Sequence, residues 1–200
     1  MTVEPDAQRS WRCFLAVPIP EALRSSLADA VAILRGDPQI EAEWRFADAG
    51  GWHVTLAFLG ATPADSVRPL VDDVAEAVND QVPFQVTTDA LGVFPSRRHA
   101  RVLWYGVQDP DRRLRELARL VQAAAELEDG TPFRPHVTLA RARDRRGTDA
   151  KALLAGGVPA GSVPVRGVTL FRSHLGRGPA RYEILAEVPL GAAVGVGALQ

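Results

Sequence analysis

The sequence predicts a single α+β domain made of two similar halves, and three observations lead to this prediction. The pentapeptide HVTLA occurs twice, from His53 to Ala57 and again from His136 to Ala140. Each copy lies in a β-prone run that follows a helical pattern, so a helix and a strand repeat together with the five letters. The 200 residues suffice for one domain with a sizeable core, whereas two independent domains would each be small.

The first half of the chain reads as strand, helix, strand, helix. Residues 11–17 (WRCFLAV) and 50–60 (GGWHVTLAFLG) are β-prone runs. Between them, residues 21–35 repeat apolar side chains with helical spacing: Leu23, Leu27, Ala30, Val31 and Leu34. Residues 62–80 carry a second such stripe: Val67, Leu70, Val71, Val74 and Val78. Pro69 indicates that this helix either starts or kinks there.

The second half contains the remaining strands and one further helix. Two β-prone runs, residues 83–94 and 100–108, flank the basic loop PSRRH. Asp109 and Pro110 then offer an N-cap and a first-turn proline for a helix with an apolar stripe: Leu114, Leu117, Ala118 and Val121. The second HVTLA strand follows, and residues 163–173 and 180–190 are predicted as the last two strands. We therefore predict one domain over residues 10–190, with residues 1–9 and 191–200 as tails.

Composition and charge exclude several classes of protein. The net charge of −1, from 23 basic and 24 acidic residues, argues against a protein that coats long nucleic acids. Cys13 is the only cysteine, so neither an intrachain disulfide nor a cysteine-based zinc cage is possible. The first ten residues lack the features of a signal peptide, and no stretch approaches the ~18 apolar residues of a membrane span. We expect a cytoplasmic protein that does not contact a membrane.

The repeated H-x-T pattern is the candidate functional feature. Side chains alternate along a strand, so His53, Thr55 and Ala57 should share one face while Val54 and Leu56 point into the core. The same alternation applies from His136 onward, with Thr138 on the face of the histidine. An imidazole and a hydroxyl two residues apart are ~6.5 Å from each other at Cβ and can reach different atoms of one phosphate group.

Two imidazoles that face each other can perform general acid–base catalysis without a metal. One takes a proton from the nucleophile and the other gives a proton to the leaving oxygen. A zinc site is unsupported because neither motif brings a neighbouring carboxylate or cysteine. We expect no metal and no cofactor, because the Ser-hydrolase, P-loop and dinucleotide-binding motifs are also absent from the sequence. His99 and His174 lack the pattern and are interpreted as structural residues.

At this point the sequence resembles a known family, the two-histidine (2H) phosphoesterases, and within it the RNA 2',3'-cyclic phosphodiesterases, also called the 2'-5' RNA ligase family. The resemblance rests on four segments that span nearly the whole chain: RCFLAVPIP, WHVTLAFLG, FRPHVTLAR and LFRSHLGRGPARYEIL. It implies a bilobal fold with two pseudo-symmetric lobes, each an antiparallel sheet backed by helices, and a central cleft lined by one H-x-T strand from each lobe.

The resemblance also implies an activity, the hydrolysis of a terminal RNA 2',3'-cyclic phosphate to a 2'-phosphomonoester. His53 matches the proton donor to O3' and His136 the base that activates water, while Thr55 and Thr138 match threonines that hold the phosphate. Phe58 matches an aromatic residue near the base and Arg141 a phosphate-binding arginine. Regular alternation would point both away from the cleft, so a twist or bulge must turn them back.

Several alternatives remain open from the sequence. Phe14 and Tyr182 are weaker candidates for walls of the cleft, and both fit core positions better. Within enzymes, the alternative is a 2'-5' phosphodiesterase or ligase, or a phosphodiesterase of small cyclic nucleotides. From another class, the alternative is a nucleotide-binding module without catalysis. The expected partners are RNA ends or nucleotides with a cyclic phosphate, and a monomer is expected.

Overall fold

The computed structural model describes residues 9–127, 132–174, 176 and 180–191, and every structural statement below concerns these residues. The predicted tails lie outside them except for Arg9 and Gly191, so the domain boundaries stay a prediction. The strands and helices follow one another along the chain in this order: β1 Ser10–Pro18, α1 Glu21–Arg35, α2 Pro38–Glu43, β2 Trp44–Phe46, β3 His53–Pro63, α3 Val67–Val78, β4 Phe84–Phe94, β5 Val102–Gln108, α4 Arg113–Ala124, β6 His136–Ala142, α5 Lys151–Leu154, β7 Gly161–Val165, β8 Gly167–His174 and β9 Arg181–Pro189.

One antiparallel sheet contains all nine strands, which confirms the α+β class. Its order is β7-β4-β5-β6-β3-β1-β8-β9, and β2 pairs with β6 beside β3. The two HVTLA strands, β3 and β6, are central neighbours, yet they pair only through Val54 and Val137. The two sheets expected from the resemblance are thus two halves of one curved sheet, joined at a single residue pair.

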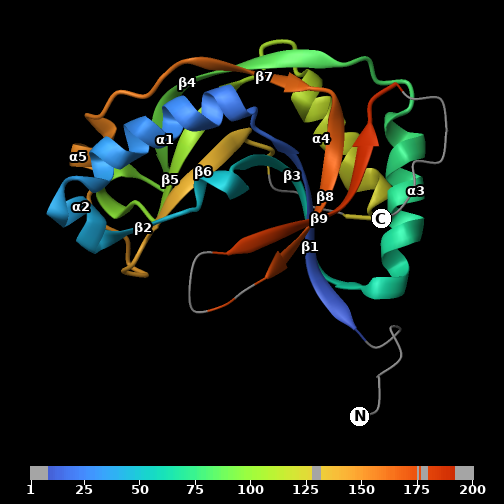
Figure 1. Ribbon diagram of the computed structural model, residues 1–200, viewed down its shortest axis with the longest axis horizontal. Helices are drawn as coiled ribbons and strands as arrows, with labels where there is room; N and C mark the ends of the chain where they lie inside the picture. The colour runs from blue at the N-terminus through green and yellow to red at the C-terminus, as the bar shows by residue number, and fades with distance from the viewer. Residues whose placement is uncertain (1–8, 128–131, 175, 177–179, 192–200) are drawn as a thin grey trace.

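The helices cover one face of this sheet, and α1 and α4 each pack against a strand from the other half of the chain, β7 and β3 respectively. Helix α1 packs near β7, where a Cβ on Gly161 would lie 2.4 Å from the side chain of Leu23. Helix α4 packs on β3, and the Gln122 side chain donates a hydrogen bond of 2.7 Å to the Leu56 carbonyl. Figure 1 shows α1 over β5 and β6, with α3 and α4 at the opposite end of the molecule.

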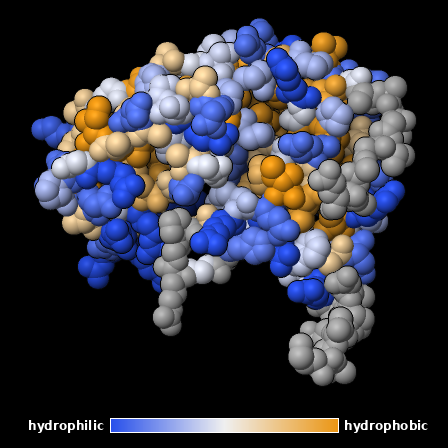
Figure 2. Space-filling model, viewed as in Figure 1, coloured by the Kyte–Doolittle hydropathy of each residue, from blue (hydrophilic) through white to orange (hydrophobic). Residues whose placement is uncertain are grey.

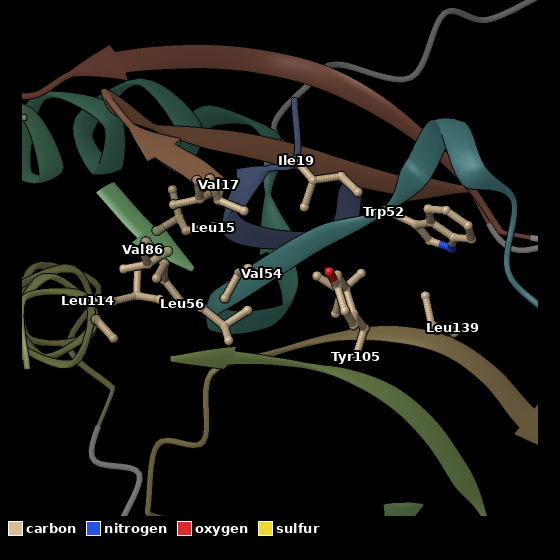
Figure 3. Packing of buried hydrophobic residues seen from close by; sticks show 14 of the residues in the cluster. Leu15, Val17, Ile19, Trp52, Val54, Leu56, Val86, Tyr105, Leu114 and Leu139 are labelled. Atoms are coloured by element: carbon tan, nitrogen blue, oxygen red, sulfur yellow. The ribbon is translucent and has the colours of Figure 1, made fainter. Parts of the chain in front are cut away.

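The main core lies between these helices and the sheet. Leu56, Val54 and Val86 of the sheet gather beside Leu114 of α4 in Figure 3, and each is at most 4% exposed. Burying a side chain of this size stabilises the fold by about 1.5–3 kcal/mol. On the visible face in Figure 2, hydrophilic side chains predominate and hydrophobic ones form separated groups. None of the described helices is long and apolar enough to cross a membrane.

Some element predictions need correction. The run 163–173 is two strands, β7 and β8, because the chain leaves β4 at Val165 and joins β1 after Arg166. Helix α4 begins at Arg113, several residues after Pro110, although the Asp109 carboxylate does accept hydrogen bonds from its first turn, at 3.0 Å from the Leu114 nitrogen. Three short elements were not predicted, because they are too short for a periodic signal: α2, β2 and α5. Pro69 lies in the first turn of α3, which starts at Val67.

A β-bulge interrupts β3 three residues after its histidine. Ala16 of β1 pairs with Thr55, but the next residue, Leu15, pairs with Ala57, so Leu56 is the extra residue. Phe14 then pairs with Phe58. Because Phe14 and Ala16 share one face of β1, Phe58 shares the face of Thr55.

Strand β6 has a bulge at the equivalent position. Trp104 of β5 pairs with Thr138, but Leu103 pairs with Ala140, so Leu139 is the extra residue, and Val102 then pairs with Arg141. Arg141 therefore shares the face of Thr138, as the family resemblance implied.

The bulges also correct one expectation. Ala57 and Ala140 do not share the face of the histidines: they are 3% and 1% exposed and lie in the main core, because each follows an extra residue that reverses the alternation. The same reversal that returns Phe58 and Arg141 to the cleft removes these two alanines from it.

The bulge on β6 can be tested by enlarging Ala140. Ala140→Leu should lower the free energy of unfolding by about 1–3 kcal/mol, because the larger side chain overpacks the core. Urea denaturation measures this change, and Ala61→Leu, at an exposed position of β3, is the matched control. A neutral effect of Ala140→Leu would place Ala140 in the open cleft and contradict the bulge.

Candidate active site

The four motif side chains meet at the junction of the two half-sheets. His53 and Thr55 flank Val54, and His136 and Thr138 flank Val137, the two residues that form the junction pair. Because the strands are antiparallel, His53 lies diagonally across from His136, with the threonines at the other corners. Diagonal neighbours of this kind are roughly 7–8 Å apart at Cα, which leaves room for a phosphate between the rings. The valines point into the core, so the four polar side chains occupy the face that the helices leave uncovered.

Both imidazoles are oriented in the same way by the backbone. The Nδ1 of His53 lies 2.6 Å from the Gly51 carbonyl, and the Nδ1 of His136 lies 2.6 Å from the Arg134 carbonyl. A carbonyl only accepts hydrogen bonds, so each Nδ1 carries a proton, and Nε2 is the nitrogen that gains or loses one. Each carbonyl belongs to the residue two positions before its histidine, so the repeat extends to the orienting groups.

Aromatic side chains enclose His53. Phe14 stacks on its ring with centroids 4.6 Å apart, and Tyr182 meets it edge-on at 5.3 Å. Phe171 stacks on Phe14 at 5.2 Å and also lies 6.0 Å from the His53 ring. Burial lowers the pKa of His53 from 6.5 to about 4, the Gly51 carbonyl opposes this shift, and the charge of His136 adds to it. His53 is therefore neutral at pH 7 in the free protein.

His136 has a more open but related environment. Phe94 meets its ring edge-on at 5.2 Å, and Trp104 lies 6.3 Å away. Trp104 fits only because residue 92 is glycine, since a Cβ there would lie 2.1 Å from the indole. Burial lowers the pKa of His136 below its ordinary value, the bond to the Arg134 carbonyl opposes this, and the charge of Arg141 adds to the lowering.

Arg141 and Tyr182 lie close enough to influence each other across the cleft. Burial raises the pKa of Tyr182, and the positive charges of Arg141 and Arg12 oppose the rise. Arg141 thus acts on His136 of one half-sheet and on Tyr182 of the other. Its guanidinium is available to an anion held between the histidines.

Two cavities, each of about 510 Å³, lie near the site, one lined in part by Thr55 and His136 and the other by aromatic neighbours of His53. The first lies beside His136 and Thr55 and is lined by Phe58, Phe94 and Phe133. Phe58 is 67% exposed there, with its ring 6.3 Å from that of Phe14. A flat aromatic wall of this kind suits a nucleobase.

The second cavity lies between the turn Ala49–Gly51 and strand β9, beside the ring partners of His53. Its lining includes Asp48, Phe171, Arg181 and Tyr182. Gly51 is required here, because a Cβ would lie 2.7 Å from the Tyr182 ring. The same glycine supplies the carbonyl that orients His53.

The structure brings the six predicted site residues to one face of the sheet, and their roles stay proposals: His53, His136, Thr55, Thr138, Phe58 and Arg141. Phe14 is buried, which agrees with the core position predicted for it. It does not join the main core, however, but packs with Phe171 and Tyr182 in a small separate cluster. Sequence reasoning did not identify Phe94, Trp104 or Phe171. Trp104 lies on β5, the neighbour of β6, and Phe94 lies one strand further, on β4, and neither belongs to a sequence repeat.

The two other histidines lie apart from this face. His99 is in the short turn Arg97–His99, and His174 bonds to Glu183 at 2.7 Å near the end of β8. Over the part of the chain that is described, no three His, Cys, Asp or Glu side chains gather as they would around a metal ion.

The fold and the paired motifs are those of the two-histidine phosphoesterases, and comparisons with known proteins identify the family. A family model described as the 2'-5' RNA ligase superfamily matches residues 23–177. The chain belongs to this superfamily.

Relatives and solved structures agree with this assignment. The chain is 31% identical to an RNA 2',3'-cyclic phosphodiesterase of Methanothermobacter thermautotrophicus over 82% of its length and 90% of the relative. It is 32% identical to a protein of the same name from Geobacillus stearothermophilus over 88% of its length, but spans only 56% of that relative. The Escherichia coli LigT structure complexed with 3'-AMP superimposes with a TM-score of 0.73 and 29% identity, over 92% of this chain and all of that one.

The lowered pKa values predict an acidic optimum. If one imidazole must be neutral and the other charged, kcat/KM should rise as the pH passes through about 4 and fall as it passes through the pKa of His136, below 6.5. Values of kcat should peak at higher pH, because a bound phosphate anion favours the charged form of both rings. Steady-state rates on a cyclic phosphate from pH 3.5 to 8.5 measure both profiles. A maximum of kcat/KM above pH 7 would contradict the prediction.

Proposed function

We propose that this protein hydrolyses a terminal 2',3'-cyclic phosphate of RNA and leaves a 2'-phosphomonoester. The observation that carries the proposal is the diagonal pair His53 and His136, each with Nδ1 fixed by a carbonyl and Nε2 left for proton transfer. The names of the curated relatives support the same activity. In a phosphodiesterase, the threonine two residues after each histidine would hold the phosphate oxygens.

In this mechanism, Nε2 of His136 takes a proton from a water molecule that attacks phosphorus. The new P–O bond forms as the P–O3' bond breaks, and Nε2 of His53 gives its proton to O3'. Thr55, Thr138 and Arg141 donate hydrogen bonds to the nonbridging oxygens, where charge accumulates. Proton exchange with solvent then restores the starting forms of the two histidines.

The environment of His53 sets a condition on its role as the acid. With a pKa of about 4, it is neutral in the free protein at pH 7 and becomes an acid only when an anion lies beside it. A cyclic phosphate between the two rings supplies that charge and raises the pKa of His53. The aromatic enclosure therefore couples protonation of the acid to substrate binding.

The same site suits two other enzymatic activities and one binding role. A 2'-5' phosphodiester has a nucleoside on each side of its phosphate, and one cavity beside Thr55 and His136 and another beside Tyr182 offer a place for each. Comparing turnover of a cyclic-phosphate-ended oligonucleotide, a free 2',3'-cyclic nucleotide and a 2'-5' dinucleotide separates the activities. Tight binding of a 2'-nucleotide with no turnover of any of them would favour a noncatalytic binding module. We further propose that RNA ends or nucleotides with a cyclic phosphate are the partners of this protein. We also propose that it is a monomer and lies in the cytoplasm.

Replacement of each histidine tests the mechanism. His53→Ala and His136→Ala should each lower kcat by roughly 100-fold or more in single-turnover cleavage of an RNA ending in a 2',3'-cyclic phosphate. Thr55→Ala and Thr138→Ala should cost less, about 1.5–3 kcal/mol each, as expected for a hydrogen bond to a charged group. Near-wild-type rates in either folded histidine variant would refute the mechanism, and a 3'-phosphate product would reverse the identity of the leaving group.

The division of roles between the histidines needs a second substrate. A nucleotide 4-nitrophenyl ester has a leaving group that departs without a proton, so it should restore much of the activity of the variant that lacks the acid. We expect restoration for His53→Ala and not for His136→Ala. The opposite pattern would exchange the two roles and leave the pair intact.

Metal independence is tested by chelation. The proposed proton transfers involve only the two imidazoles, so activity should be unchanged in excess EDTA. The assay uses the same RNA substrate, with each divalent ion added back separately as a control. Complete loss of activity, restored by one particular ion, would show that a metal takes part.

A further inference from the structure

Strand β2 places a second arginine beside Arg141. Arg45 pairs directly with Arg141, between the pairs Trp44 with Ala142 and Phe46 with Ala140. Trp44 and Ala140 are each 1% exposed and point into the core, so Arg45 and Arg141 both point to the face of the histidines. Residues paired in this way have Cβ atoms about 4.5–5.5 Å apart. The chain thus holds two guanidinium groups side by side at the edge of the site.

Neither charge is neutralised by the part of the protein that is described. Other arginines form ion pairs, such as Arg35 with Glu41 at 3.1 Å, but Arg45 and Arg141 form none with a described carboxylate. The acidic residues nearest to Arg45 in the chain have other partners. Glu43 accepts a hydrogen bond from Thr148 at 2.9 Å, and Asp48 accepts one from the Gly50 nitrogen at 2.8 Å.

Two like charges directly opposite each other on a sheet are destabilising, and an anion between them removes the repulsion. Paired guanidinium groups suit phosphate in particular, because their planar donors match its oxygens. A phosphate-binding role therefore explains the pair of arginines better than a role in stabilising the fold.

The position of the pair relative to the histidines indicates which phosphate it fits. Because Leu139 and Ala140 together occupy one position opposite Leu103, Arg141 lies two strand positions beyond Thr138. Two positions correspond to about 6.8 Å, comparable to the length of one nucleotide unit. A phosphate at Arg45 would then be one sugar away from the phosphate between the histidines.

We propose that Arg45, together with Arg141, binds the phosphate attached to O5' of the terminal nucleoside. The inference rests on the proposed function and narrows the substrate to the end of an oligonucleotide, in preference to a free cyclic mononucleotide. Arg141 contacts both phosphates in this arrangement, because its charge also reaches His136 and Tyr182. Arg45 serves only the second phosphate.

Three substrates separate this contribution from catalysis. They are adenosine 2',3'-cyclic phosphate, the same compound with a 5'-phosphate, and the dinucleotide ApA ending in a 2',3'-cyclic phosphate. For the wild type, kcat/KM should be higher on the two compounds with the extra phosphate. Arg45→Gln should lower that preference at least tenfold, mainly through KM, and Arg45→Lys should keep part of it. The control Arg115→Gln removes the same charge from an exposed position on α4 and should keep the wild-type preference.

Other results would overturn the inference. An equal loss on all three substrates would place Arg45 at the cleaved phosphate or in the framework, and no loss on any would remove it from the site. The melting temperature gives a separate check: Arg45→Gln should not lower it, because one of two repelling charges is removed.

Failure of the proposed function would be recognised separately. If the wild type cleaves none of the three compounds, calorimetric binding of adenosine 2',5'-bisphosphate and of adenosine 2'-phosphate decides the inference. The wild type should bind the bisphosphate at least tenfold more tightly, and Arg45→Gln should lose this difference. Equal affinity of the wild type for the two compounds would refute the second phosphate site.

Discussion

The pairing of Val54 with Val137 is the contact on which the site depends. It is the only pairing between β3 and β6, yet it sets the distance and the relative direction of both H-x-T motifs. Each valine is fully buried, so the helices on the far side of the sheet fix the position of the pair. The histidines and threonines on the open face are held by the backbone of these strands, and they need no side-chain bonds to one another. Their hydrogen-bonding groups therefore stay available to a substrate.

Burial has opposite effects on the two faces of the sheet. On the core face it stabilises the fold through side chains such as Leu56 and Leu139. On the open face, Phe14 and Tyr182 surround His53 and make its charged form unfavourable. An environment that disfavours a charged imidazole is typical of functional sites, where strongly shifted pKa values are common. An exposed histidine would be easier to protonate but would respond less to the charge of a bound anion.

Much of this arrangement was predictable from the sequence, and the limits have physical causes. The repeat of HVTLA located both central strands and the four polar side chains, because alternation along a strand is a strong local constraint. The return of Phe58 and Arg141 to the cleft required a bulge, but its position at Leu56 and Leu139 depends on pairing with β1 and β5 and is not written in the local pattern. The sequence did not predict three further residues at the site, Phe94, Trp104 and Arg45, because their strands reach the site through pairing with segments distant in the chain. In addition, β2, which carries Arg45, is too short to show periodicity.

The crossing of α1 and α4 has a consequence for how the two halves of the chain relate to each other. Each half contributes a helix that covers strands of the other, and β2 of the first half pairs only with β6 of the second. A half expressed alone would leave apolar sheet surface exposed to water and would lack part of its own covering layer. If the symmetry arose by duplication of a shorter gene, the ancestral product would have needed to associate as an intertwined dimer, with one motif from each copy in a shared site. Fusion of the copies would then have let the two motifs diverge, so that one histidine came to differ from the other in burial and charge.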